Sequence, residues 1–186
     1  MVDRLPPLPD DALTPAQREA AAAVIAGPRG GLYGPFVPLL RSPELLGHAQ
    51  RLGEYLRYRS AIGTQLSELA ILMVARHWSQ DVEWAIHAPI AAQAGIAADT
   101  IAAIGARATP PRLTADEAIV HAFCTELQAT QRVSDATFER ARARFGEHGV
   151  VDLLGLCGYY TLLAMVMNGA QTALPPNAPR PPWAEP

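Results

Sequence analysis

A glutamine, two glutamates and a histidine with the chemistry for proton transfer lie near the middle of this 186-residue chain. Gln80, Glu83 and His87 are separated by three and four residues, so a rotation of about 100° per residue places them on one face of a helix. Glu68 lies twelve residues before Gln80. Histidine moves protons near neutral pH, and a carboxylate within reach fixes its tautomer. These four residues are therefore the candidates for acid–base chemistry.

Two interpretations of the pair Glu83 and His87 are open. As an exposed pair four residues apart it would stabilise a helix by only about 0.2–0.5 kcal/mol and would carry no function. The surroundings favour a buried site instead, because Glu68 lies among Leu66 and Leu69 and a carboxylate there is costly to bury without a partner. A helix pair that brings His87 to Glu68 would supply that partner.

Capping signals place the helices that must position these residues. Thr14 and Thr114 each begin a capping box. Ser79 is the expected cap of the helix that carries His87, and Asp99 is the expected cap of a short helix after it. The predicted helices span residues 15–26, 43–59, 64–77, 80–94, 100–106, 115–131, 135–146 and 149–170.

The composition predicts one all-α domain over residues 1–174. Hydrophobic positions recur at helical spacing and alternating β-type runs are few. Residues 27–38 are rich in glycine and proline, which predicts a loop. The tail, residues 175–186, is rich in proline and is expected to be extended, either lying across a neighbouring subunit or mobile.

Charge and hydropathy limit the partners. A net charge of −3 and a pI near 5.9 argue against nucleic acid as a partner. The most apolar stretch, residues 153–167, is shorter than the roughly 20 residues that a membrane span needs, so a buried core helix is expected and no membrane contact. The N-terminal segment lacks the apolar core of a signal peptide, which predicts a cytoplasmic protein. Cys124 and Cys157 lie far apart in apolar helical contexts and are expected to be buried, reduced thiols.

Two segments together carry a family resemblance. The motif PELL, followed by a helix with tyrosine and arginine and then by ELAILMVARHWSQDVEWAIHAPIAAQAGI, resembles the carboxymuconolactone decarboxylase family, relatives of alkylhydroperoxidase D. The resemblance is most specific over residues 32–106. It implies an alkylhydroperoxidase D-like bundle of about eight helices that assembles as a trimer or hexamer.

The same resemblance separates two chemistries. In the alkylhydroperoxidase branch it implies a glutamate, two cysteines in a CxxC motif and a histidine. This chain has Glu68 and His87 at matching spacing but Gln80 and Glu83 where the cysteines would be. Thiol peroxidase activity is therefore not expected. The leading hypothesis is a lyase of aromatic compound catabolism that decarboxylates a carboxylated lactone without a cofactor.

Roles for the polar residues follow from that reaction. We expect His87 to be the proton donor or base, with Glu83 orienting it and Glu68 tuning its charge. Gln80 is expected to donate a hydrogen bond to a lactone or enolate oxygen. A substrate carboxylate also needs a cation, for which the candidates are Arg41, Arg51, Arg57 and Arg76.

Aromatic residues are expected to bind the substrate. Tyr33 and Phe36 lie in the predicted loop and are candidates for closing the mouth of a pocket. Trp84 lies next to Glu83, and Tyr159 and its neighbour Tyr160 lie in the last long helix.

Three further interpretations stay open. The same pocket would suit an isomerase, hydratase or cyclase that acts on a related small molecule. A non-catalytic, ligand-binding oligomer would need no reaction at all. Glu68, Glu83 and His87 also have ligand types that suit zinc or iron, but one histidine with carboxylates is a weak signal, so no metal is expected.

Overall fold

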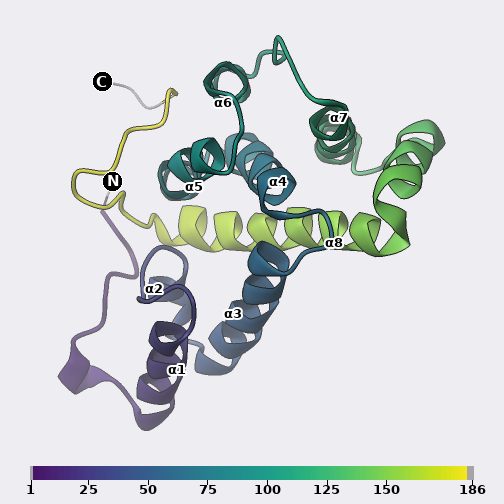
Figure 1. Ribbon diagram of the computed structural model, residues 1–186. Helices are drawn as coiled ribbons and strands as arrows, with labels where there is room; N and C mark the ends of the chain where they lie inside the picture. The colour runs from purple at the N-terminus through teal and green to yellow at the C-terminus, as the bar shows by residue number, and fades with distance from the viewer. Residues whose placement is uncertain (1, 184–186) are drawn as a thin grey trace.

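Helices account for all the regular structure of the described residues, 2–183, in this computed structural model (Figure 1). Eight α-helices and one short 3₁₀ helix are present there and no strand, which confirms the predicted all-α class. The 3₁₀ helix is η1 (Asp10–Ala12), and the α-helices are α1 (Pro15–Ala26), α2 (Phe36–Leu39), α3 (Pro43–Tyr58), α4 (Thr64–His77), α5 (Asp81–Gln93), α6 (Ala98–Gly105), α7 (Ala115–Thr130) and α8 (Asp135–Ala170).

Both predicted capping boxes form. The Thr14 hydroxyl accepts from the backbone N–H of Gln17, and the Thr114 hydroxyl accepts from that of Glu117, each at 3.2 Å. In both boxes the side chain at the third position accepts from the backbone N–H of the threonine. These local hydrogen bonds satisfy N–H groups that have no partner within the helix, which explains why α1 and α7 begin where the sequence indicates.

Three local predictions are wrong. Gln80 caps α5 in place of Ser79, because Ser79 has a φ of +45° and belongs to the turn that leaves α4. Ala97 caps α6, and Asp99 lies in its first turn. The short helix α2 also lies largely within residues 27–38, where only a loop was expected, because Phe36 and Leu39 bury their side chains in the core.

The central helix of the fold is α4. Every residue from 66 to 75 is buried, so this helix is enclosed on all sides. It packs against α5, α7 and α8. A polar side chain on α4 therefore has to find its partner inside the protein.

The longest helix, α8, bends at Gly146. This glycine has φ +69° and ψ 173°, which lie outside the helical region. Glycine adopts such values without steric cost because it has no Cβ. Figure 1 shows the part before the bend turning away from the long part that crosses the fold. The break expected after residue 146 is thus a kink and not a loop.

Within the described residues, α8 is also the one helix long and apolar enough to cross a membrane. Its most apolar window of 18 residues is 56% buried inside the protein. A core helix of a soluble protein passes the same length and composition test, so this signal is weak.

Two contacts tie α8 to its neighbours. Asp152 accepts hydrogen bonds from the Tyr55 hydroxyl at 2.9 Å and from the backbone N–H of Ala61 at 2.8 Å, which holds the end of α3 against α8. Cys124 and Cys157 are buried, free thiols, as predicted, and helix packing places their sulfurs 3.6 Å apart.

The described part of the tail packs on its own chain. The indole N–H of Trp183 donates to Asp81 at 2.8 Å, and its ring meets that of Trp84 at a centroid distance of 5.0 Å. The guanidinium of Arg76 lies 4.4 Å from the Trp183 ring centre. The predicted extended tail therefore ends, as far as residue 183, against α5; residues 184–186 lie outside the described part.

Candidate active site

Three of the four candidate residues converge inside the fold. Glu68 on α4 places Oε2 at 2.6 Å from Nδ1 of His87 on α5. The other ring nitrogen, Nε2, lies 3.3 Å from Oε2 of Glu83. All three side chains are at most 5% exposed. The solvent-exposed interpretation of Glu83 and His87 is therefore wrong.

The turn between α4 and α5 produces this convergence. Gln80 ends the turn, and its side-chain oxygen accepts from the backbone N–H groups of Val82 and Glu83 at 2.7 and 3.0 Å. Its amide nitrogen donates to Asn168 on α8 at 3.0 Å. Gln80 is therefore occupied in starting α5 and fixing it to α8.

An arginine completes a chain of charged groups. Nε of Arg57 on α3 lies 3.5 Å from Oε1 of Glu68, although this oxygen accepts no hydrogen bond. Arg29 on the loop before α2 stacks over the Phe36 ring at 4.6 Å and donates to the Tyr159 hydroxyl at 3.5 Å. Arg57 is thus the cation that faces the buried carboxyl group of Glu68.

The protonation of Glu83 differs from that of an exposed carboxyl group. Burial raises the pKa of Glu83 above its ordinary value, although the charges of His87, Arg29 and Arg57 oppose this shift. Burial also favours the neutral form of an acid generally. In the His87 tautomer whose Nδ1 donates to Glu68, Nε2 is free to accept a proton from Glu83.

Two tyrosines of α8 close the site from the other side. The Tyr160 ring meets the His87 ring edge-on at a centroid distance of 5.2 Å. Burial raises the pKa of Tyr159 to about 12 and that of Tyr160 well above its ordinary value. Both phenols are therefore neutral at physiological pH, and the buried Tyr160 hydroxyl has no hydrogen-bond partner.

A small cavity adjoins these groups. Its volume is about 20 Å³, room for about one water molecule. Two of the residues that line it have a buried polar atom without a hydrogen-bond partner, namely Arg29 Nε and the Tyr160 hydroxyl. The lining residues are Arg29, Tyr33, Pro35, Phe36, Arg57, Glu83, Ile86, His87, Tyr160 and Leu163.

The predicted substrate-binding residues divide into two groups. Tyr33 and Phe36 line the cavity. Gln80 and Trp84 do not, since Gln80 caps α5 and Trp84 packs against Trp183. Tyr159 lies behind Tyr160, with its ring 5.2 Å from that of its neighbour.

Of the four candidate arginines, Arg57 alone lines the cavity. Arg41 donates to the backbone oxygens of Leu5 and Pro6, and Arg76 donates to that of Gly105. Arg51 contacts His48 on the surface. Each of these three is occupied elsewhere.

Sequence reasoning missed Arg29. Its signal is a lone arginine in a run of glycine and proline, where the backbone can approach a buried site closely. The segment has no phosphate-loop signature. Only the contacts of Arg29 with Phe36 and Tyr159 show that this arginine lies at the site.

Among the described residues, no group of three or more histidine, cysteine, aspartate or glutamate side chains has the arrangement of a metal site. No family model, curated protein or solved structure gives a significant match to this chain. The family resemblance therefore rests on the sequence motifs alone.

Proposed function

We propose that this protein is a cofactor-independent lyase that decarboxylates a small carboxylated lactone. The observation that supports the proposal is the buried chain of contacts from Arg57 through Glu68 and His87 to Glu83, beside a cavity that contains unpartnered polar atoms. A buried ionisable chain of this kind is costly to maintain, and such groups concentrate at functional sites.

In the proposed complex, guanidinium groups hold the substrate. Arg29 and Arg57 both line the cavity, and a guanidinium binds a carboxylate through two parallel hydrogen bonds. The unpartnered Tyr160 hydroxyl is a neutral donor for a carbonyl or enolate oxygen. This is the role that the sequence suggested for Gln80.

The proposed reaction breaks the bond between the carboxylate carbon and the ring. Carbon dioxide leaves, and the electron pair moves into the unsaturated lactone toward its carbonyl oxygen. A proton from the pair Glu83 and His87 then bonds to carbon. Glu68 holds Nδ1 of His87, so it takes the orienting role, and Glu83, which lines the cavity, is the acid.

Substrate entry requires the loop before α2 to move, because the cavity holds no more than about one water molecule. Tyr33 in this loop is 41% exposed, and its hydroxyl donates to the backbone oxygen of Arg29 in the same loop. Gly30 and Gly34 have positive φ and allow the backbone to rearrange. We propose that this loop opens and closes over the site.

Measurement of carbon dioxide release from 4-carboxymuconolactone tests the proposal. We expect turnover by the wild type, a loss of at least about a hundredfold in His87→Ala, and normal turnover in His48→Ala, an exposed histidine. Full activity in His87→Ala removes His87 from the mechanism. Absence of turnover by the wild type overturns the decarboxylase assignment.

Alternative reactions in the same pocket include isomerisation, hydration and cyclisation. A second candidate function is a non-catalytic oligomer that binds a small ligand through the unpartnered polar atoms of Arg29 and Tyr160. For either function we propose a homo-oligomer, a trimer or hexamer. Exposed apolar side chains on α3 and α8 support it: Leu45, Leu52, Val151, Leu154 and Met165. Light scattering after size-exclusion chromatography measures the mass, and a monomer contradicts this proposal.

A further inference from the structure

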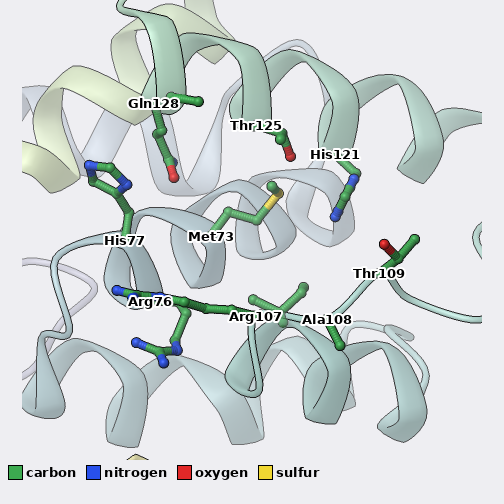
Figure 2. Close-up of a pocket in the computed structure, with 11 residues that line it drawn as sticks. Met73, Arg76, His77, Arg107, Ala108, Thr109, His121, Thr125 and Gln128 are labelled. Carbon is green, nitrogen blue, oxygen red and sulfur yellow. The ribbon is translucent and has the colours of Figure 1, made fainter.

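A second and larger cavity lies between α4, the end of α6 with the connection that follows it, and α7. Its volume is about 320 Å³, and it shares no lining residue with the cavity at His87. Figure 2 shows α7 above it, with Gln128, Thr125 and His121 directed toward side chains of α4 and of the connection after α6. A cavity of this size is at the lower end of the range for small-molecule sites.

The charge of this cavity is uncompensated. Arg76, Arg107, His77 and His121 line it, and no aspartate or glutamate does. Within residues 2–183, none of these four side chains has an ion pair with a carboxylate. Burial lowers the pKa of Arg76, and the charge of Arg107 lowers it further. The two cations therefore repel each other, and an anion bound beside them would relieve this repulsion.

The two arginines differ in their freedom to bind. Arg76 already donates to the Gly105 carbonyl and the Ser79 hydroxyl and stacks on Trp183. Arg107, which follows α6, is exposed. One available guanidinium matches a ligand with a single negative charge.

Polar and apolar groups around the cavity define the rest of the ligand. The amide nitrogen of Gln128 is buried and has no hydrogen-bond partner, so it is a donor that lacks an acceptor. Met73 and Ile104 are buried apolar residues that line the cavity. A ligand that satisfies all of these groups has an acidic end and an apolar body.

We propose that this cavity is a binding site for a small organic monocarboxylate, with Arg107 pairing with the carboxylate and Gln128 donating to it. The apolar body contacts Met73 and Ile104. It has the size of a single ring or of two fused rings. This site is separate from the proposed catalytic site, and the inference stands whether or not the protein is a decarboxylase.

Isothermal titration calorimetry with 2-naphthoate tests the inference. We expect saturable binding by the full chain, about tenfold weaker binding by Arg107→Gln and by Gln128→Leu, and much weaker binding of the neutral 2-naphthalenemethanol. Arg112→Gln is the matched control, because Arg112 lies in the same connection but pairs with Asp99 on the surface. It should bind 2-naphthoate as the wild type does.

Several results overturn the inference. They are the absence of saturable binding, equal binding of the alcohol, and wild-type affinity in Arg107→Gln. Tighter binding of inorganic phosphate than of 2-naphthoate rejects the monocarboxylate class. Circular dichroism melting curves show whether each variant is folded, and a folded Arg107→Gln with normal affinity counts against the site.

Discussion

Glu68 and His87 are nineteen residues apart in the sequence, and their side chains meet at 2.6 Å in the interior. The contact joins α4 to α5, and both side chains are almost completely buried. A carboxylate at Nδ1 fixes which ring nitrogen carries the proton, so Nε2 faces Glu83 as an acceptor. This relationship is the basis of the first prediction.

Glu68→Gln should lower activity while preserving the shape of the site. Glutamine has the size of glutamate but no charge, so it cannot stabilise an imidazolium at His87 or compensate Arg57. We expect kcat on the carboxylated lactone to fall about a hundredfold or more. The control is Glu44→Gln, an exposed residue of α3. Equal kcat values in the two variants contradict a role for the Glu68 charge.

The raised pKa of Glu83 predicts a specific dependence of stability on pH. Between the ordinary value of 4.5 and the raised value, the native state keeps a proton that the unfolded state releases. The contribution of Glu83 to the free energy of unfolding is therefore full below pH 4.5 and is lost as the pH rises through the folded pKa. Glu83→Gln has no such proton, so wild type should lose stability relative to this variant as pH increases.

Urea unfolding of both proteins from pH 5 to pH 9 measures that difference. The two stability profiles should diverge toward high pH, with the variant the more stable there. Parallel profiles would mean that Glu83 is ionised in the native protein at ordinary pH, and its proposed role as an acid would then be lost.

Gly53 is a position where a single methyl group should disrupt the site. A Cβ there would overlap with the Tyr159 hydroxyl and with the Arg29 guanidinium, both of which must then move. We expect Gly53→Ala to lower the free energy of unfolding by about 1–3 kcal/mol and to reduce activity. Thermal or urea unfolding measures the first effect and the decarboxylation assay the second.

Gly158→Ala is the matched control for that substitution. Gly158 also lies inside a helix, but an added Cβ meets no atom within 4 Å. Alanine has the higher helix propensity, so this variant should gain about 0.5–1 kcal/mol of stability. A similar loss of stability in both variants would argue against the close packing of Gly53.

The thiols should be unreactive in the native protein. The contact with Cys157 and burial both raise the pKa of Cys124 well above its ordinary value, which disfavours the nucleophilic thiolate. We expect iodoacetamide to label both cysteines only after unfolding in urea, and Cys124→Ala to retain decarboxylase activity. Rapid consumption of hydrogen peroxide by the wild type, abolished in Cys124→Ala, would contradict the absence of thiol chemistry.

Local signals predicted most of the helices. The hydrogen bonds of the capping boxes at Thr14 and Thr114 lie within one helical turn. The residue types in those turns were therefore sufficient to predict where α1 and α7 begin. The cap of α5 was misplaced because the backbone of Ser79 turns to φ +45° as the chain leaves α4. Propensity alone does not distinguish Ser79 from Gln80, since the geometry of the turn decides between them.

Local signals also predicted part of the candidate site, but not the contacts between distant segments. Helical spacing placed Glu83 and His87 on one face, and the apolar neighbours of Glu68 indicated that this carboxylate is buried. Spacing could not show that Gln80 caps α5, because the geometry of the preceding turn decides this. It also could not show that Gln80 donates to Asn168 or that Trp84 packs against Trp183, because these contacts depend on residues of α8 and of the tail.

By itself the sequence determined the all-α class, most helix boundaries and the residue types available for acid–base chemistry, since these depend on periodicity and short-range capping. Only the tertiary structure decided that Glu68 reaches Nδ1 of His87, that Arg29 and Arg57 line the same cavity as His87, and that Tyr160 closes it. These contacts join four helices and a loop. Their geometry is set by how buried surfaces pack, which no local pattern specifies.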